Sequence, residues 1–349
     1  MCGITGILSF KKSDTDLNPI IRMMTNAIRH RGPDAEGIWI ENSIALGHRR
    51  LSIIDISEAG NQPMFSHDQR FVIVFNGEIF NFQEIKSKLN DYPFRSESDT
   101  EVLLAAYQKW GEECLEYLNG QFAFSIWDRV KQSLFIARDR LGIKPLFYFK
   151  NDQFFIFSSE IRAILNTNLV ERKLSQKGLI NYLNYQTVHS PNTIIKDVFQ
   201  LPSGSFLKIE KEKTIEKKYW NLTQIQKTHP TKKQILNQLK KAVERRMISD
   251  VPLGAFLSGG IDSSAIVALM SEVSEKPIET FSVIFNEPEF SEAPFARIVA
   301  KKYKTNHHEI QLSPEYFLEQ LPSALESMDH PSGDGINIYI VSQATKNQG

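Results

Sequence analysis

The chain has 349 residues, of which 41% are hydrophobic and 23% charged, and its 41 Lys and Arg balance its 41 Asp and Glu. This composition is typical of a globular protein of about two domains, and without a basic excess it gives no indication of a nucleic-acid or membrane-surface partner. Since no apolar run approaches the roughly 18 residues that span a bilayer and the N-terminus lacks a signal-peptide pattern, we expect a soluble cytoplasmic protein that acts on small molecules.

The chain begins with Cys2 directly after the initiating methionine, and Cys114 is its only other cysteine. Two distant cysteines argue against a disulfide framework or a cysteine metal site and suit a reducing cytoplasm. Methionine is normally trimmed before a small residue, which would leave Cys2 with both a thiol and a free α-amine. Because the amine titrates at about 7.7–8.0 and the thiol at about 8.5, the amine can accept the thiol proton. By itself, however, a cysteine at position 2 is usually incidental.

Short β-rich runs separated by turn signals fill the first 200 residues, and they predict layered, largely antiparallel sheets. These runs are residues 37–48, 71–80, 121–128, 134–139 and 153–160. Helices are expected at 17–29, 81–89 and 98–111. In the last of these, Ser98 and Glu101 have the spacing of a capping box and Gly111 ends the helical pattern.

The second half of the chain has a different organisation. The sequence becomes polar and Lys-rich from about residue 205, so we expect a first domain at 1–210, a linker at 211–230 and a second domain at 231–349. A helix is expected at 231–248. Beyond it, apolar strands (251–257, 279–285, 307–312) alternate with helices (261–270, 291–304), which predicts a parallel, doubly wound α/β sheet.

A glycine turn, LSGGIDSS (257–264), joins the first of these strands to a helix. Its glycines allow close backbone approach, and the helix N-terminus offers N–H groups to an anion. No Lys-Ser/Thr pair follows the glycines and no GxGxxG is present, so it is neither a Walker loop nor a dinucleotide loop. A bare SGG turn is as often structural as functional.

Six motifs together resemble the N-terminal-nucleophile glutaminase domain of asparagine synthetases: MCGITG, HRGPD (30–34), LGHRRLSIID (46–55), FNGEIFN (75–81), SDTE (98–101) and ARDRLGIKPLFY (137–148). The resemblance covers residues 1–205 and implies an α+β four-layer sandwich of antiparallel sheets. It implies that Cys2 is the nucleophile, which forms a glutamyl thioester that water then cleaves.

The same resemblance assigns the remaining residues of a glutamine site. Arg50 takes the α-carboxylate in a bidentate grip, and Asp99, together with Glu78, takes the α-ammonium. Asn76 and the Gly77 N–H form the oxyanion hole. Leu51 and Ile53 also belong to the glutamine site.

Each of these residues also has a purely structural interpretation. Arg50 could be a surface arginine next to Arg49, Asp99 a first-turn helix acid, and Asn76-Gly77 a common turn. In ARDRLGIKPLFY we favour the structural interpretation: Arg138, Asp139 and Gly142 shape a turn between strands, and Lys144 is not catalytic.

LSGGIDSS resembles the pyrophosphate loop of ATP-pyrophosphatases, which cleave ATP between its α and β phosphates and adenylate a carboxylate. The resemblance assigns ATP binding to Ser258, Gly259, Gly260, Asp262, Ser263 and Ser264, and adenine and ribose contacts to the backbone at Leu257 and Val283. Mg²⁺ is expected with ATP. His307 and His308 are adjacent on a strand and therefore face opposite sides, so we expect no protein metal site.

The sequence is thus identified as a member of the glutamine-dependent asparagine synthetase family, a carbon–nitrogen ligase of asparagine biosynthesis whose substrates are glutamine, ATP and aspartate. Three alternatives stay open. The first is another acceptor carboxylate, such as a sugar acid of surface-polysaccharide synthesis. The second is glutaminase activity alone, or a second half that only binds nucleotide and regulates the first, and the third is a self-processing peptidase. The oligomeric state, including a homodimer, is also open. Because the family continues with an SGxGxDE segment after the stretch that ends at Gly349, we expect a truncated, poorly stable second domain.

Overall fold

The computed structural model describes residues 2–346 except 12–14, 225–227, 286, 288 and 290. The chain divides into two compact units. Unit 1 contains residues 1–226 and 329–331, and unit 2 contains residues 227–328 and 332–349. No helix in the described ranges is long and apolar enough to cross a membrane.

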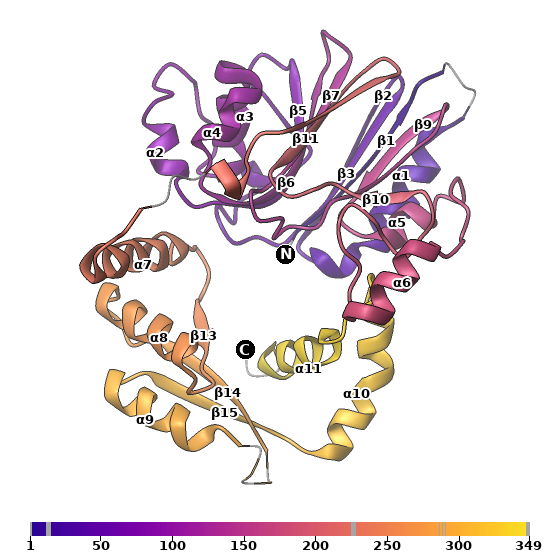
Figure 1. Cartoon of the computed structure of the whole chain (residues 1–349). Helices are drawn as coiled ribbons and strands as arrows, with labels where there is room; N and C mark the ends of the chain where they lie inside the picture. Colours follow the sequence, from indigo (N-terminus) through magenta and orange to yellow (C-terminus); the bar gives the residue numbers. More distant parts are fainter. Residues whose placement is uncertain are drawn as a thin grey trace. The chain divides into compact units, whose positions relative to one another are not determined.

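Unit 1 is built on two six-stranded sheets in which every pair of neighbouring strands is antiparallel (Figure 1). The first sheet, in spatial order, comprises β10 (Val198–Gln200), β8 (Phe147–Lys150), β9 (Phe154–Ser158), β1 (Gly3–Ser9), β3 (Ile44–Arg50) and β2 (Ala35–Glu41). The second comprises β12 (Lys213–Lys218), β11 (Ser205–Glu210), β7 (Ser133–Arg138), β6 (Gly120–Asp128), β5 (Phe71–Ile79) and β4 (Met64–Phe65).

Helices cover the outer faces of the two sheets, which completes four layers. Apolar side chains from both sheets, such as Ile4, Val72 and Trp127, form the core between them. Helices α1 (Leu17–Ala27) and α5 (Ile161–Leu165) pack on the first sheet, and α3 (Asp99–Trp110) packs on the second. The unit also contains α2 (Phe82–Lys86), α4 (Cys114–Tyr117) and α6 (Gln176–Tyr185). This arrangement confirms the predicted four-layer sandwich.

Helix α3 begins and ends where the sequence predicts, but its N-terminus differs in detail. Ser98 accepts a hydrogen bond from the Thr100 N–H, and Gly111 ends the helix with a φ of 58°. The Glu101 carboxylate does not complete a capping box. It accepts instead from the backbone N–H groups of Arg95 and Ser96, because the chain before the helix turns back over it.

Part of the segment assigned to the linker is ordered as a strand. Residues 213–218 form β12, which pairs with β11 at the edge of the second sheet. Most of its side chains are exposed, and its Lys-rich sequence is typical of an edge strand protected against further pairing. The same composition made this strand look like a polar linker.

Unit 2 is a small parallel α/β sheet, as predicted. Its three strands lie in the order β13 (Gly254–Phe256), β14 (Glu279–Phe285), β15 (Asn306–Leu312), and both pairs are parallel. Its helices are α7 (Lys232–Arg246), α8 (Ile261–Val273), α9 (Ala293–Tyr303), α10 (Pro314–Ser327) and α11 (Gly335–Lys346). Helices α8 and α9 share one apolar cluster, and α10 and α11 share another with β14 and β15.

We expect unit 2 to be the less stable of the two units. The described part of its sheet has only three strands, its edge strand β13 has three residues, and large apolar side chains such as Ile261, Phe295 and Ile298 are exposed. Local opening is easiest where few apolar contacts hold the backbone. Hydrogen exchange of the intact chain should therefore show weaker protection in β13–β15 than in β1, β5 and β6. Equal protection of the two sets of strands would contradict this expectation.

Candidate active site

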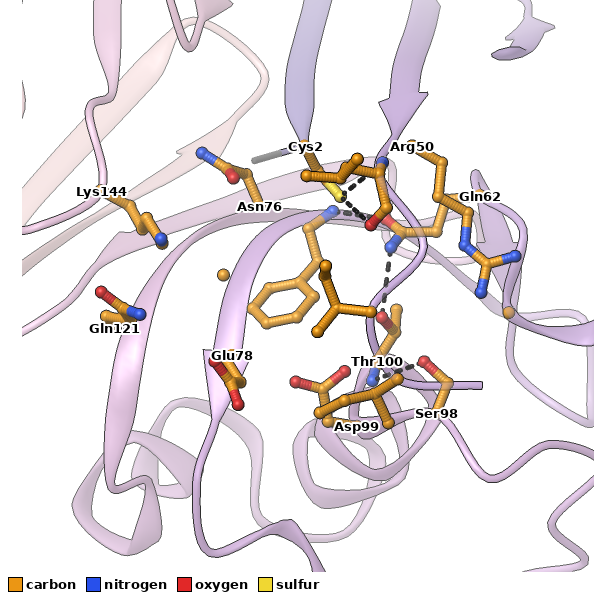
Figure 2. Close-up of a pocket in the computed structure, with 16 residues that line it drawn as sticks. Cys2, Arg50, Gln62, Asn76, Glu78, Ser98, Asp99, Thr100, Gln121 and Lys144 are labelled. Atoms are coloured by element: carbon orange, nitrogen blue, oxygen red, sulfur yellow. Dashed lines mark hydrogen bonds between the residues drawn. The ribbon is translucent and has the colours of Figure 1, made fainter. Parts of the chain in front are cut away.

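One cavity in unit 1 brings together the eight residues that the sequence assigns to glutamine hydrolysis. Its volume is about 280 Å³, which suits a single small molecule (Figure 2). The eight residues are Cys2, Arg50, Leu51, Ile53, Asn76, Gly77, Glu78 and Asp99. They come from four separate regions of the chain, so the fold, and not the sequence order, creates their proximity.

Cys2 lies immediately before β1, and two groups hold it in place. The Leu51 N–H donates to Cys2 Sγ at 3.4 Å, and Arg31 Nε donates to the Cys2 carbonyl oxygen at 2.9 Å. Burial raises the pKa of the Cys2 thiol, while the hydrogen bond from Leu51 opposes that rise. The thiol therefore needs a nearby base to become a nucleophile at neutral pH.

Histidine does not supply that base. None of the described residues that line the cavity is a histidine. His48, on β3, is buried and its Nε2 lies 3.1 Å from the Phe75 carbonyl oxygen, to which it donates. Burial lowers the pKa of His48 to about 3, so its imidazole stays neutral. The base must therefore be a group other than a histidine side chain of this cavity.

Asn76 and Gly77 lie in the middle of β5 and not in a turn. They pair with Ala123 and Phe122 of β6, which excludes the turn interpretation. Asn76 is 1% exposed, yet neither Nδ2 nor Oδ1 has a hydrogen-bond partner among the described residues. A buried amide without partners costs stability, so a ligand that hydrogen-bonds to it would be favoured in this cavity. A side chain at Gly77 would collide with the Gln121 carbonyl oxygen.

Arg50 is buried at the end of β3, which excludes the surface interpretation. Its Nη1 donates to the Ser57 carbonyl oxygen at 2.6 Å and to Asn61 Oδ1 at 2.9 Å, and its Nη2 donates to the Asp55 carbonyl oxygen. These three acceptors are neutral oxygens, while Arg50 also helps to lower the pKa of the Asp55 carboxylate. The guanidinium group of Arg50 is therefore fixed in place at the wall of the cavity.

Asp99 and Glu78 supply negative charge on the side of the cavity away from Cys2 (Figure 2). Asp99 is the first residue of α3, and its Oδ2 accepts from the Ile79 N–H at 2.9 Å. Burial, followed by repulsion from Glu78, raises the pKa of Asp99 to about 7, whereas the hydrogen bond from Ile79 lowers it. A bound ammonium group would relieve both unfavourable effects.

The glycine turn of unit 2 forms a compact loop between β13 and α8. Gly259 has a φ of 81°, and a Cβ there would collide with the backbone of Phe295 and Ala296 in α9. The hydroxyls of Ser258 and Ser263 lie 3.0 Å apart across the loop, while Asp262 and Ser264 occupy the first turn of α8. A Cβ at Gly260 would lie 3.3 Å from the Ser258 hydroxyl oxygen, so a side chain there would crowd the loop. The loop can therefore offer backbone N–H groups to an anion.

A second cavity, of about 370 Å³, lies beside this loop in unit 2. Leu257, Ser258 and Val283 line it, together with the aromatic side chains of Phe256, Phe281, Phe285 and Phe317. The other predicted ATP-binding residues, Gly259, Gly260, Asp262, Ser263 and Ser264, follow Ser258 and do not line this cavity. An apolar cavity next to an anion-binding turn suits a nucleotide.

Comparison with known proteins matches both parts of the chain. A family profile described as "Glutamine amidotransferase domain" matches residues 1–220, and one described as "Asparagine synthase" matches residues 234–349. The "Putative asparagine synthetase [glutamine-hydrolyzing] 2" of Methanocaldococcus jannaschii is 38% identical over 99% of this chain and 72% of its own length. The chain belongs to the glutamine-hydrolysing asparagine synthetase family.

Members of this family are glutamine-dependent ligases that use ATP. Two relatives from Bacillus subtilis, named "Asparagine synthetase [glutamine-hydrolyzing] 3" and "1", are 34% and 35% identical over 95% and 99% of this chain. The chain spans 57% and 56% of their lengths, little more than half of each.

Several side chains around the Cys2 cavity were not assigned to it from the sequence. They include Gln62, Ser98, Thr100, Gln121 and Lys144. Arg138, Asp139 and Gly142 do shape a turn, since Arg138 donates to the Gly142 and Lys144 carbonyl oxygens and Gly142 has a φ of 69°. That turn also places buried Lys144 against the cavity, which motif spacing alone does not indicate.

His307 and His308 have separate partners on β14. His307 Nδ1 lies 3.0 Å from Thr280 Oγ1, and His308 Nε2 lies 2.7 Å from a Glu279 carboxylate oxygen. Within the described ranges, no three His, Cys, Asp or Glu side chains are grouped to hold a metal ion. The two imidazoles therefore contact different residues of β14.

The raised pKa of Asp99 predicts how glutamine affinity depends on pH. Below about pH 7 the carboxyl group is protonated and cannot pair with an α-ammonium, so affinity should increase about tenfold from pH 6 to pH 8. Calorimetric titration of glutamine into the Cys2→Ala variant measures this without turnover. Adding Asp99→Asn should leave weak binding at both pH values. Unchanged pH dependence in that double variant would assign the titration to another group.

Proposed function

We propose that this chain hydrolyses glutamine at Cys2 after removal of Met1. The α-amine of Cys2 accepts the proton of Sγ, and Sγ attacks the carbon of the glutamine side-chain amide. Asn76 Nδ2 and the Gly77 N–H stabilise the tetrahedral oxyanion. The amine then protonates the leaving nitrogen, which departs as ammonia and leaves a glutamyl thioester. Water attacks that thioester, glutamate is released and the thiol is restored.

The unpartnered amide of Asn76 carries this proposal. It is buried in the cavity that contains Cys2, and a group that binds there would satisfy it. Arg50 and Asp99 complete the description of the ligand, because a fixed cation and an anion within one small cavity match an α-carboxylate and an α-ammonium. An amino acid with a side-chain carbonyl satisfies all three requirements.

We further propose that the ammonia amidates a carboxylate that unit 2 has activated with ATP, with aspartate as the acceptor and asparagine, AMP and pyrophosphate as products. The loop at 258–264 would hold pyrophosphate, and the apolar cavity at Leu257 and Val283 would hold adenine and ribose. Mg²⁺ keeps several waters and binds mainly to phosphates, so the Asp262 carboxylate in the first turn of α8 would be the protein group that holds it. When bound, the ion neutralises phosphate charge.

Two assays separate the halves of this proposal. Incubation with glutamine should release glutamate without ATP, and exchange of labelled pyrophosphate into ATP should require an acceptor acid. Aspartate should support the exchange, and sugar acids should not. If only a sugar acid supported the pyrophosphate exchange, that acid would replace aspartate as the proposed acceptor. If glutamate were released but no acid supported the exchange, the activity of this chain would be restricted to glutamine hydrolysis.

A further inference from the structure

Residues 329–331 belong to unit 1 although they follow α10 of unit 2 in sequence. Asp329 is well buried there. One oxygen of its carboxylate accepts from the Ile161 N–H at 2.5 Å, and the other accepts from the Arg162 N–H at 2.8 Å and from Arg162 Nε at 3.2 Å. His330 stacks on Phe147 of β8. These contacts hold the first residues of α5, whose own N-cap residue, Glu160, provides no capping side chain.

Glu160 connects this region to a second arginine. Its carboxylate accepts from Arg31 Nη1 at 3.0 Å, lies 2.8 Å from His30 Nε2, and pairs with Arg162 Nε at 3.1 Å. The Glu160 side chain is 7% exposed and that of Arg31 is 10% exposed, so these charges are shielded from solvent. Two carboxylates and two guanidinium groups therefore pair in a cluster whose most exposed member is Arg162, at 30%. Loss of one partner from such a largely buried cluster is costly.

The cluster ends at the nucleophile. Arg31 Nε donates to the Cys2 carbonyl oxygen at 2.9 Å, so the position of Arg31 fixes the backbone that carries Sγ. The continuous series of contacts thus runs from Asp329 to Arg162, Glu160, Arg31 and Cys2. None of the first three lines the Cys2 cavity. The hydrogen-bonded connection from these residues to the cavity runs through Arg31 and the Cys2 carbonyl oxygen.

We propose that Asp329 is a positioning residue for Cys2. This inference rests on the proposed glutamine hydrolysis. Asp329 fixes the backbone at 161–162 and the Nε of Arg162, and Arg162 in turn orients Glu160. Glu160 then orients Arg31 against the Cys2 carbonyl oxygen. A small displacement of Cys2 Sγ should lower the rate of its attack on the amide carbon. It should affect glutamine affinity much less, because glutamine is held by Arg50 and Asp99.

Asp329→Asn in the full chain tests the proposal. We expect kcat for glutamine hydrolysis to fall about tenfold with KM unchanged, because Arg50 and Asp99 are untouched. Alkylation of Cys2 by iodoacetamide, followed on the N-terminal peptide, should change in rate as well. Asp329→Glu, which keeps the charge but displaces it, should lose less activity. Combining Asp329→Asn with Glu160→Gln should cost no more than the larger single loss, since both interrupt one series.

Asp128→Asn is the matched control, because Asp128 is also a buried carboxylate paired with an arginine, Arg70, and has no contact with this cluster. It should lower the melting temperature without affecting Cys2. The proposal would be overturned if Asp329→Asn and Asp128→Asn lost equal activity, or if the losses of Asp329→Asn and Glu160→Gln were additive. It would also be overturned if Asp329→Asn kept the wild-type kcat and alkylation rate. If the wild-type chain released no glutamate, the proposed function would fail, and a changed alkylation rate confined to Asp329→Asn would still support the positioning role.

Discussion

Replacing Cys2 by alanine should reduce glutamine hydrolysis at least about 10⁴-fold, because the only thiol in the cavity is lost and no described histidine or hydroxyl occupies its position. The effect should appear in kcat. Binding should persist, since Arg50, Asp99 and Glu78 are unchanged. Glutamate release measured under saturating glutamine gives the rate, and calorimetry gives the affinity.

Cys2→Ser and Cys114→Ser are the matched controls for this loss. A hydroxyl at position 2 is a much weaker nucleophile beside an amine base, so Cys2→Ser should be nearly as inactive as Cys2→Ala. Cys114 is fully buried in α4, outside the cavity, and its replacement should leave kcat intact. Activity that survives in Cys2→Ala would remove Cys2 from the mechanism. Activity that disappears in Cys114→Ser without a loss of folding would show that the second thiol is also required.

Asn76→Ala should lower kcat about 10²–10³-fold, the usual effect of removing one oxyanion donor. The Gly77 N–H would remain, so the variant should still release some glutamate. Because neither polar atom of the Asn76 amide has a partner in the structure, its removal breaks no internal hydrogen bond, and thermal stability should not fall. Rate and melting temperature measured on the same preparation test both statements.

Asn76→Asp is the isosteric control. It keeps the shape of the side chain but replaces a donor by a negative charge, which repels the oxyanion, so its kcat should be at or below that of Asn76→Ala. A kcat near wild type in Asn76→Asp would show that the side chain acts through packing. A large drop in melting temperature for Asn76→Ala would show that its amide is satisfied within the fold.

The strands of unit 1 and the alternating elements of unit 2 could be predicted from the sequence because their hydrophobic patterns are local. The glutamine site could be predicted only through motifs, since Cys2, Arg50, Asn76 and Asp99 lie far apart in the chain and meet through sheet pairing. Asn76-Gly77 shows the limit of local signals. The pair is typical of a turn, yet in β5 it is extended because Asn76 and Gly77 pair with Ala123 and Phe122 of β6.

Side chains that reach the site through contacts between distant parts of the chain could not be predicted from motifs. Lys144 reaches the cavity because Arg138 and Asp139 fold the turn that carries it. Asp329 lies more than 160 residues from the helix that it holds, and no spacing indicates that contact. Strand β12 was not predicted because its sequence is rich in lysine. Such a composition protects the edge of a sheet, but it is also typical of a polar linker.

The most direct measurement is the mass of the N-terminal peptide after the chain is mixed with glutamine and quenched in acid within a few turnovers. The proposed mechanism predicts a peptide that begins at Cys2, with a fraction carrying a glutamyl group that hydroxylamine removes. Glutamate formed at the wild-type rate from a chain that still carries Met1, or from one whose Cys2 is never modified, would contradict it.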